Sequence, residues 1–311
     1  MLRENKIPKR IYRRVIKSEL TPERFVCPTR FGGNMVYDVM YYNAPYTMQE
    51  IGRLREIAFR EAGGGTGKPL DIDEYDIMEK PFHQLLVWNP KEGEIISSYR
   101  YILGSDIIDN PKGIISPVTK LFRFSDEFIS DYLPYSIELG RSFVQPKYQA
   151  SRLGAFALDN IWDGLGAIIC LNPQIKYFYG KVTMYKNYNK FARDLILYFL
   201  KKHFSAPKPL IQPVQPLPFH HDESELAALL TSDDFHEDFK ILTKETQKLQ
   251  CRIPPLINIY MGLSPMMYSF GTAENSSFGE VEETAMLLKI DDIYESKKER
   301  HINNFLDSRS R

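Results

Sequence analysis

Two strand-like runs joined by a tight turn limit the folds that are open to this chain. Residues His83–Trp88 and Glu94–Leu103 are rich in aromatic and β-branched side chains, as strands are. The segment Asn89–Gly93 between them contains proline and glycine, which favour a turn. A turn this short joins antiparallel strands only, so the sequence predicts a hairpin inside an antiparallel sheet.

The other periodic segments alternate between helix and strand patterns. Thr47 and Glu50 form a capping box that predicts a helix from Met48 to Ala62, which ends before three glycines. We expect further helices over residues 152–168, 190–203, 223–231 and 234–250, and further strands over residues 135–144, 176–184, 266–270 and 285–290. This order predicts an α/β (α+β) fold in which helices flank a mixed, mostly antiparallel central sheet.

One segment interrupts this order of helices and strands. Residues 205–219 contain five prolines, which cannot continue a helix. The segment is therefore predicted to be an extended, proline-rich connection. No internal repeat is visible in the 311 residues.

The charge of the chain is unevenly distributed. Lys and Arg number 40, as do Asp and Glu, and this zero net charge argues against a nucleic-acid-binding protein. Residues 1–17 carry seven basic side chains and one acidic one, so the other 294 residues hold 33 basic and 39 acidic. Apolar residues recur at helical spacing here, which predicts a basic amphipathic arm over residues 1–20. Such an arm can bind an anionic membrane surface or an acidic protein through residues 3–17, or pack on the domain with a solvated charged face.

The sequence also bears on location and metals. The longest apolar runs fall far short of the ~20 residues that a spanning helix needs, and the basic start lacks the apolar stretch of a signal peptide. Three scattered cysteines suit a reducing compartment. We therefore expect a cytoplasmic protein, with the inner membrane face as a peripheral location. No metal site is expected, because Asp71–Asp76 lacks the glycine and final glutamate of a calcium loop.

Three short segments, taken together, resemble one family: the first is Leu54–Asp76, the second Ser98–Arg100 and the third Glu138–Val144. In order and spacing they are similar to the acyl-carrier-protein-dependent branch of the GNAT superfamily. That branch includes acyl-homoserine-lactone synthases and the amino-acid N-acyltransferases of ornithine-lipid and glycine-lipid synthesis, some labelled hemolysin-like. The residues that match the recurrent positions of this branch are Arg55, Phe59, Asp73, Asp76, Arg100, Glu138 and Arg141. The segment Ile253–Leu263, followed by Phe278, resembles the lipid-forming members.

The resemblance covers about residues 45–290 and implies that residues 21–311 form a single GNAT-like acyltransferase domain. It implies transfer of a long-chain fatty acyl group, with or without a 3-hydroxyl, from acyl carrier protein to the α-amine of glycine or ornithine in aminolipid synthesis. Two alternatives stay open. One is a signal synthase that uses S-adenosylmethionine, which the missing family tryptophan disfavours. The other is a non-catalytic protein that binds or perturbs lipids.

The donor is expected to lie beside the third segment. By the resemblance, Ser142, Phe143, Arg152 and Gly154 would bind an acyl-phosphopantetheine thioester, so no permanently bound cofactor is implied. The pyrophosphate loop of the superfamily is incomplete over residues 149–154, where its central glycine is missing. This favours acyl carrier protein over coenzyme A as the donor.

A bulge would make the third segment chemically useful. On a regular strand, Glu138 and Arg141 point to opposite faces. A bulge at Gly140 would bring both side chains to one face and expose N–H groups that can polarise a thioester carbonyl. Glu138 is then a candidate general base, and Tyr185, just after the predicted strand 176–184, a candidate to protonate the leaving thiolate.

The other charged residues allow two interpretations. Asp73 and Asp76 could hold the acceptor ammonium, while Arg100 or Arg141 binds its carboxylate through two hydrogen bonds. Alternatively, a structural ion-pair network is formed by Arg55, Asp73, Arg100, Glu138 and Arg141, since such networks also gather charged groups.

Overall fold

The computed structural model describes residues 5–149 and 152–309, with the backbone alone at residues 152–155. Eight of its strands form one sheet: β1 (Phe25–Pro28), β2 (Met35–Val39), β3 (His83–Asn89), β4 (Glu94–Leu103), β6 (Ser136–Val144), β7 (Tyr177–Met184), β9 (Met267–Asn275) and β10 (Val281–Lys289). Their order is β1-β2-β3-β4-β6-β7-β10-β9, and only β6 and β7 pair in parallel. The predicted mixed, mostly antiparallel sheet is confirmed.

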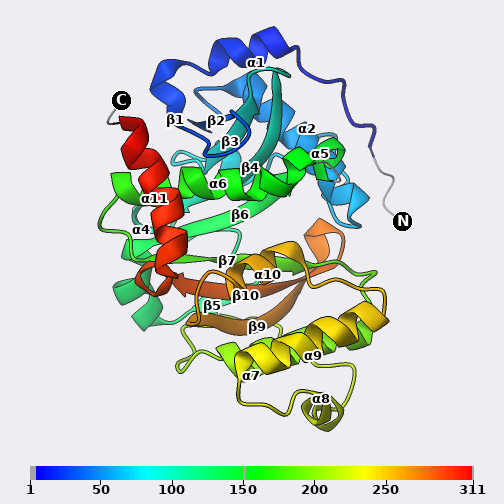
Figure 1. The fold of residues 1–311 in the computed structure, drawn as a ribbon. Coiled ribbons are helices and arrows are strands. Elements are labelled where there is room, and N and C mark those ends of the chain that lie inside the picture. The colour runs from blue at the N-terminus through cyan, green and yellow to red at the C-terminus, as the bar shows by residue number, and fades with distance from the viewer. Residues whose placement is uncertain (1–4, 150–151, 310–311) are drawn as a thin grey trace.

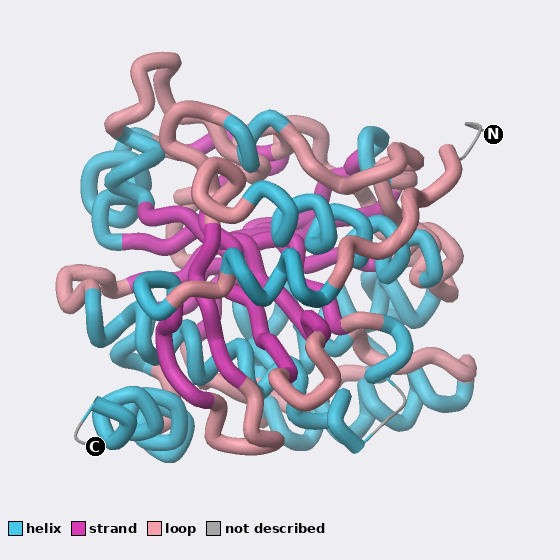
Figure 2. The backbone as a smooth tube through the Cα atoms, turned by 90° about the horizontal axis from the view of Figure 1, so that it is seen from above, coloured by secondary structure: helices cyan, strands magenta, loops and turns pink. Residues whose placement is uncertain are grey.

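Helices cover both faces of this sheet, which lies in the middle of the molecule (Figures 1 and 2). One face packs against α6 (Arg152–Leu171), α7 (Lys190–Phe204), α9 (Phe235–Lys248), α10 (Pro255–Met261) and α11 (Glu295–Arg309). The other face packs against α2 (Pro45–Glu61). Shorter helices are α1 (Arg13–Glu19), α3 (Glu74–Ile77), α4 (Gly104–Ile108), α5 (Pro146–Gln149) and α8 (Glu223–Leu229). The helices on the two faces bury apolar side chains on both sides of the sheet, as the predicted α/β (α+β) fold requires.

The long periodic segments fold as predicted, whereas several short or polar ones were missed. The hairpin of β3 and β4, strands β6 and β7 and helices α6, α7, α8 and α9 are confirmed, to within a few residues at their ends. Strands β9 and β10 extend several residues beyond the predicted segments. The prediction did not include β1, β2 or α11. Helix α11 buries only His301 and Phe305, which is too narrow an apolar stripe to detect.

The predicted capping box of α2 is wrong. The helix begins at Pro45 with Ala44 as its N-cap, so Thr47 lies inside the first turn. The carboxylate of Glu19, at the end of α1, accepts hydrogen bonds from the backbone N–H groups of Tyr46 (3.1 Å) and Thr47 (2.6 Å). A side chain from another helix therefore caps α2, which a local sequence pattern cannot reveal.

The basic arm packs on the domain. The helix of the arm, α1, starts only at Arg13 and is therefore shorter than the spacing of apolar residues predicts. Ile16 is buried, and Arg10 and Arg13 contact the buried carboxylate of Glu94 at 2.6 and 2.8 Å. The helix thus packs on the domain with Arg14 and Lys17 exposed, whereas Arg10 and Arg13 are paired with Glu94. Binding of a membrane or of an acidic protein by the arm stays a prediction.

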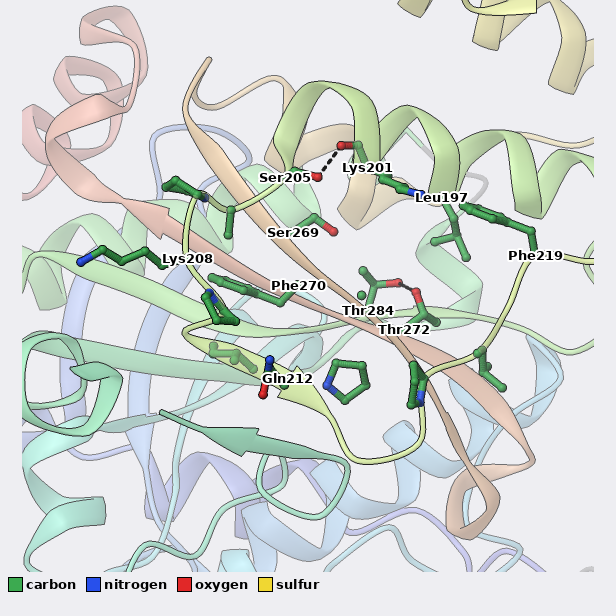
Figure 3. A pocket seen from close by; sticks show the side chains of 18 residues that line it. Leu197, Lys201, Ser205, Lys208, Gln212, Phe219, Ser269, Phe270, Thr272 and Thr284 are labelled. Carbon is green, nitrogen blue, oxygen red and sulfur yellow. Dashed lines mark hydrogen bonds between the residues drawn. The ribbon is translucent and has the colours of Figure 1, made fainter. Parts of the chain in front are cut away.

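The proline-rich connection runs along the edge strand β9. It contains β8 (Ile211–Pro213), which pairs with β5 (Phe122–Phe124) in a small second sheet. Between this connection and β9 lies an open groove of about 700 Å³, where Thr272 and Thr284 share a hydrogen bond (Figure 3). None of the described residues that line it is a carboxylate or a histidine, and its charged side chains are Lys201 and Lys208.

Candidate active site at the divergence of two parallel strands

A cavity opens where β6 and β7 part. The two strands pair only over residues 136–139 and 177–180, after which β6 continues beside β4 and β7 beside β10. Gly180 stands at the branching point, where a Cβ atom would lie 2.3 Å from the Leu139 carbonyl oxygen. The cavity between the diverging strands has a volume of about 550 Å³, which suits a small-molecule site.

The walls of this cavity combine apolar and charged side chains. Apolar lining comes mainly from α2, β6 and the start of α10, and includes Phe59, Phe143, Phe278 and Leu256. The charged residues that line it are Arg100, Glu138, Arg141, Lys181, Arg252 and Glu283. Charged groups inside a partly apolar cavity are typical of sites that bind and transform polar substrates.

Strand β6 carries the predicted bulge, although not at Gly140. Gly140 pairs with Arg100 and Phe143 with Ser98, so Arg141 and Ser142 both stand opposite Tyr99. Arg141 has a φ angle of 52°, in the left-handed region of backbone conformation that residues other than glycine rarely adopt. The bulge thus lies one residue later than predicted. It has the expected consequence, since Glu138 and Arg141 both line the cavity.

Glu138 is buried at the floor of the cavity and is 1% exposed. Its carboxylate accepts hydrogen bonds from the Tyr179 hydroxyl at 2.7 Å and from the Val118 backbone N–H at 3.3 Å. Burial raises the pKa of Glu138, and the hydrogen bonds of Ser116 and Tyr179 and the charge of Lys181 offset only part of that rise. A raised pKa makes this carboxylate a better proton acceptor than an exposed glutamate.

Behind the cavity lies a network of three arginines and three aspartates. Arg100 contacts Asp73 at 2.7 Å and Asp76 at 3.3 Å, and Arg55 contacts Asp76 at 3.3 Å. Arg141 reaches Asp71 at 3.0 Å. Three positive charges balance three negative ones, so the network is neutral without a ligand.

The network divides the predicted substrate-binding residues into two groups. Phe59, Arg100 and Arg141 line the cavity, whereas Arg55, Asp73 and Asp76 do not. Asp73 also caps α3 by accepting from the Tyr75 N–H, and although burial acts to raise its pKa, Arg100 and Arg141 lower it below its usual range. The structural interpretation of the ion pairs thus describes the contacts of Asp73 and Asp76 well.

Two aromatic rings fix the orientation of Arg141. Its guanidinium lies 3.9 Å from the ring centre of Phe278 and 5.9 Å from that of Phe59. Such cation–π contacts favour a charged group held over a ring face. With Asp71 on one side and two rings beside it, Arg141 is held in place despite its strained backbone.

The remaining predicted residues fall in and around the same cavity. Ser142, Phe143 and Tyr185 line it, and burial raises the pKa of Tyr185 to about 12. The Ser142 hydroxyl oxygen is buried and has no hydrogen-bond partner among the described residues. Arg152 and Gly154 belong to the first turn of α6, of which the structure describes the backbone alone.

Sequence reasoning missed one charged pair in the cavity. Lys181 of β7 lies 2.7 Å from Glu283 of β10, and both line the cavity opposite Glu138. No short motif marks either residue, because the two strands are far apart in sequence and meet only in the sheet. Alternation along β7 would have been the available signal, since Lys181, Thr183 and Tyr185 all face the cavity.

Metal binding and membrane crossing can be examined on the described residues. Within residues 5–149 and 152–309, no group of three or more His, Cys, Asp or Glu side chains is arranged to hold a metal ion. No described helix combines the length and apolar character required to cross a membrane.

Comparison with solved structures gives matches of low score to acyl-homoserine-lactone synthases. The structure of LasI matches with a TM-score of 0.39 and 13% identity over 82% of this chain and 89% of that one. The CoA-dependent synthase MesI matches with a TM-score of 0.35 and 11% identity over 86% of this chain and 95% of that one.

Sequence comparison gives a much closer relationship. Residues 54–158 match the model of the acetyltransferase (GNAT) domain. Glycine N(alpha)-acyltransferase of Bacteroides thetaiotaomicron is 52% identical, with 97% of this chain and 91% of the relative covered. The protein of the same name from Phocaeicola vulgatus is 50% identical over 95% of this chain and 92% of the relative. The chain therefore belongs to the GNAT-type acyltransferase family that contains these two proteins.

Proposed function

We propose that the protein transfers a long-chain fatty acyl group from acyl carrier protein to the α-amine of glycine, a first step in aminolipid synthesis. The observation that carries this proposal is the position of Glu138, a buried carboxylate with a raised pKa beside the strand bulge in the cavity. The names of the relatives at 52% and 50% identity favour glycine over ornithine as the acceptor.

The proposed reaction forms a C–N bond and breaks a C–S bond. The thioester carbonyl would lie at the bulge, where backbone N–H groups of β6 face no strand and can donate to the developing oxyanion. The bound ammonium first gives up one proton to solvent, and as the neutral amine attacks, Glu138 takes the second proton that the nitrogen releases. When the intermediate collapses, Tyr185 protonates the leaving thiolate, since a hydroxyl with a pKa of about 12 keeps its proton near neutral pH.

The arginines of the network act as positioning residues in this scheme. Arg100 and Arg141 line the cavity while their charges are balanced by Asp73, Asp76 and Asp71. We assign the aspartates an indirect role, in which they hold the arginine side chains at the cavity wall. Because the arginine side chains are already oriented, they do not have to reorganise when the substrate binds.

Acyl carrier protein is favoured as the donor by two features of the chain. The superfamily's pyrophosphate loop lacks its central glycine over residues 149–154. In addition, Lys6, Lys9, Arg14 and Lys17 of the arm are exposed and suit an acidic protein partner. Attachment of the same arm to an anionic membrane is a further prediction about its location.

The lipid extract of an expressing cell tests the proposal. The chain is expressed in a host without aminolipids, and the extract is examined by mass spectrometry beside that of the Glu138→Gln variant. We expect N-acylglycine with the parent chain and little or none with the variant. An N-acyl ornithine would correct the acceptor, and the absence of any N-acyl amino acid despite abundant folded protein would overturn the proposal.

The purified protein separates the donors. Glycine is offered with acyl carrier protein or with coenzyme A carrying the same acyl chain, and amide formation is followed by mass spectrometry. We expect a kcat/KM at least tenfold higher with acyl carrier protein. Equal or greater use of acyl-coenzyme A would contradict acyl carrier protein as the donor. A lactone product formed with S-adenosylmethionine would contradict glycine as the acceptor.

A further inference from the structure

The ion pair of Lys181 and Glu283 is placed where an acceptor has to bind. We propose that these two residues form the acceptor subsite, in which Lys181 binds the carboxylate of a small zwitterionic amino acid and Glu283 binds its ammonium group. This inference rests on the proposed function and names the residues that recognise its second substrate.

The first support is position. Lys181 lies on β7 immediately after Gly180, the last residue of β7 that pairs with β6, so it stands at the start of the divergence. Glu283 lies on the neighbouring strand β10, opposite Thr183. Both face the same cavity as Glu138, which lies on β6 across the gap. An amino acid held here would have its nitrogen between the carboxylate of the subsite and the proposed base.

The second support is burial of a full charge pair at a cavity wall. The side chains of Lys181 and Glu283 are only 9% and 6% exposed. Placing two charges in such surroundings costs more than an apolar pair of the same size would. A zwitterion compensates for this cost, because it brings one charge of each sign and leaves the subsite neutral both before and after binding.

The third support is unused hydrogen-bonding capacity. Of the three ammonium N–H donors, Lys181 directs one to Glu283 and one to the Pro117 carbonyl oxygen at 2.8 Å. The contacts of Glu283 converge on Oε2, which also accepts from Asn275 at 3.0 Å. A third N–H of Lys181 and the Oε1 atom of Glu283 therefore remain for a ligand within the described part of the chain.

The other charged residues of the cavity suit this role less well. Arg100 and Arg141 are already balanced by aspartates, and their contacts would have to break before a carboxylate could take their place. Arg252 is exposed at the rim of the cavity. Glu138 accepts a proton in the proposed reaction and cannot also serve as the binding partner of the ammonium group. Binding of the ammonium therefore requires a second carboxylate, which Glu283 supplies.

The test compares acceptors with and without a carboxylate. The parent chain and Lys181→Met are assayed with glycine and with glycinamide, which keeps the amine but lacks the negative charge. We expect the parent to prefer glycine in kcat/KM by about 10- to 100-fold, the range of a charge-assisted hydrogen bond. In Lys181→Met the preference should collapse towards one, mainly through a higher KM for glycine, with the value for glycinamide little changed.

A matched control lies just beyond the ends of the same two strands. Lys186 and Glu280 also form an ion pair near the ends of β7 and β10, but they are exposed and do not line the cavity. Lys186→Met should therefore keep the preference for glycine. If Lys181→Met does not fold, Lys181→Gln retains an N–H donor for Pro117 and is expected to show the same collapse.

The outcomes are distinguishable from those of the proposed function. A parent chain that acylates neither glycine nor glycinamide contradicts the proposed function itself. A parent that acylates glycine selectively, together with a Lys181 variant that folds and keeps this selectivity, overturns the acceptor subsite alone. Glu283→Gln supplies the second half of the test, since it should raise the KM of both acceptors by a similar factor.

Discussion

Burial sets the chemistry of Glu138 more than any neighbouring charge does. Its carboxylate is enclosed by Tyr179, Ser116 and the Val118 backbone, and burial is the largest influence on its pKa. Asp71, also fully buried, has its pKa raised by burial as well, although Arg141 and Arg55 oppose the rise. Glu138 differs because it opens onto the cavity, and a proton acceptor has to reach its substrate.

The pH dependence of the reaction should therefore follow Glu138. The raised pKa means that the carboxylate loses its proton only above the ordinary value of 4.5, so kcat/KM should rise with pH through an acidic limb above pH 4.5. Glu138→Gln should lower kcat by about 10²- to 10⁴-fold and abolish this limb. A pH–rate profile of both proteins checks the prediction, with the exposed Glu74→Gln as a control that keeps the parent profile.

Sequence reasoning could single out those residues of the candidate site that a local pattern marks. Glu138 and Arg141 are three apart on one strand, and this spacing led to the bulge and to the shared cavity. The exact position of the bulge was not accessible, because glycine at 140 suggested the strained position that Arg141 occupies instead. Lys181 and Glu283 were not accessible at all, since their contact depends on the pairing of two distant strands.

At the scale of elements, side chains from neighbouring segments fix where helices begin and how strands separate. Glu19 of α1 supplies the cap that the first turn of α2 lacks, and it also accepts from the Thr47 hydroxyl at 2.7 Å. The helix that carries Phe59 to the cavity is thus oriented partly by the arm. A pattern confined to residues 44–50 could predict the helix but not the residue that caps it.

Removal of this cap should destabilise the fold. Glu19→Ala leaves the N–H groups of Tyr46 and Thr47 without their acceptor and should lower the free energy of unfolding by about 1 kcal/mol. Chemical denaturation of the purified protein measures the change. Glu61→Ala, at the exposed end of the same helix, should have little effect. Equal losses in both variants would show that Glu19 does not act as a cap.

The branching of β6 and β7 depends on the absence of a side chain at Gly180. In Gly180→Ala the new methyl group would meet the Leu139 carbonyl oxygen at 2.3 Å, so the strands would have to move apart. We expect a loss of about 3 kcal/mol in unfolding free energy, at the upper end for overpacked sites. Gly262→Ala, where the nearest atom is 3.4 Å away, is the control and should change stability by less than about 1 kcal/mol. A thermal denaturation series on the two variants decides between these outcomes.

At the scale of the whole molecule, one buried carboxylate joins three parts of the chain. Glu94 of β4 binds Arg10 and Arg13 of the arm, Lys147 of α5 and the Tyr148 hydroxyl. The sheet, the arm and the helix that follows β6 are thereby tied together beside the cavity. The distribution of charge along the sequence predicted the separation between arm and body, whereas the contact that neutralises part of it appears only in three dimensions.

This junction should make stability depend on pH. Burial acts to raise the pKa of Glu94, but hydrogen bonds from Lys147, Arg10 and Tyr148 outweigh it and lower the pKa to about 2. Because the folded pKa is below the unfolded value, the contribution is present above about pH 4.5 and is lost as the pH falls to about 2. Glu94→Gln should remove about 1–2 kcal/mol at neutral pH and flatten this dependence, as urea denaturation at several pH values would show. An unchanged pH dependence in the variant would assign it to other groups.

The parting of β6 from β7 also has a consequence for the exchange of amide hydrogens with solvent. Beyond Leu139, the side of β6 that faces β7 borders a cavity instead of a strand, so its N–H groups should exchange with deuterium far faster than those shared with β4. A bound acyl thioester that takes the place of the missing strand would protect them. Exchange at residues 140–144, followed by mass spectrometry with a non-hydrolysable donor analogue, would then report occupancy of the site without any turnover. Equal exchange with and without the analogue would place the donor elsewhere.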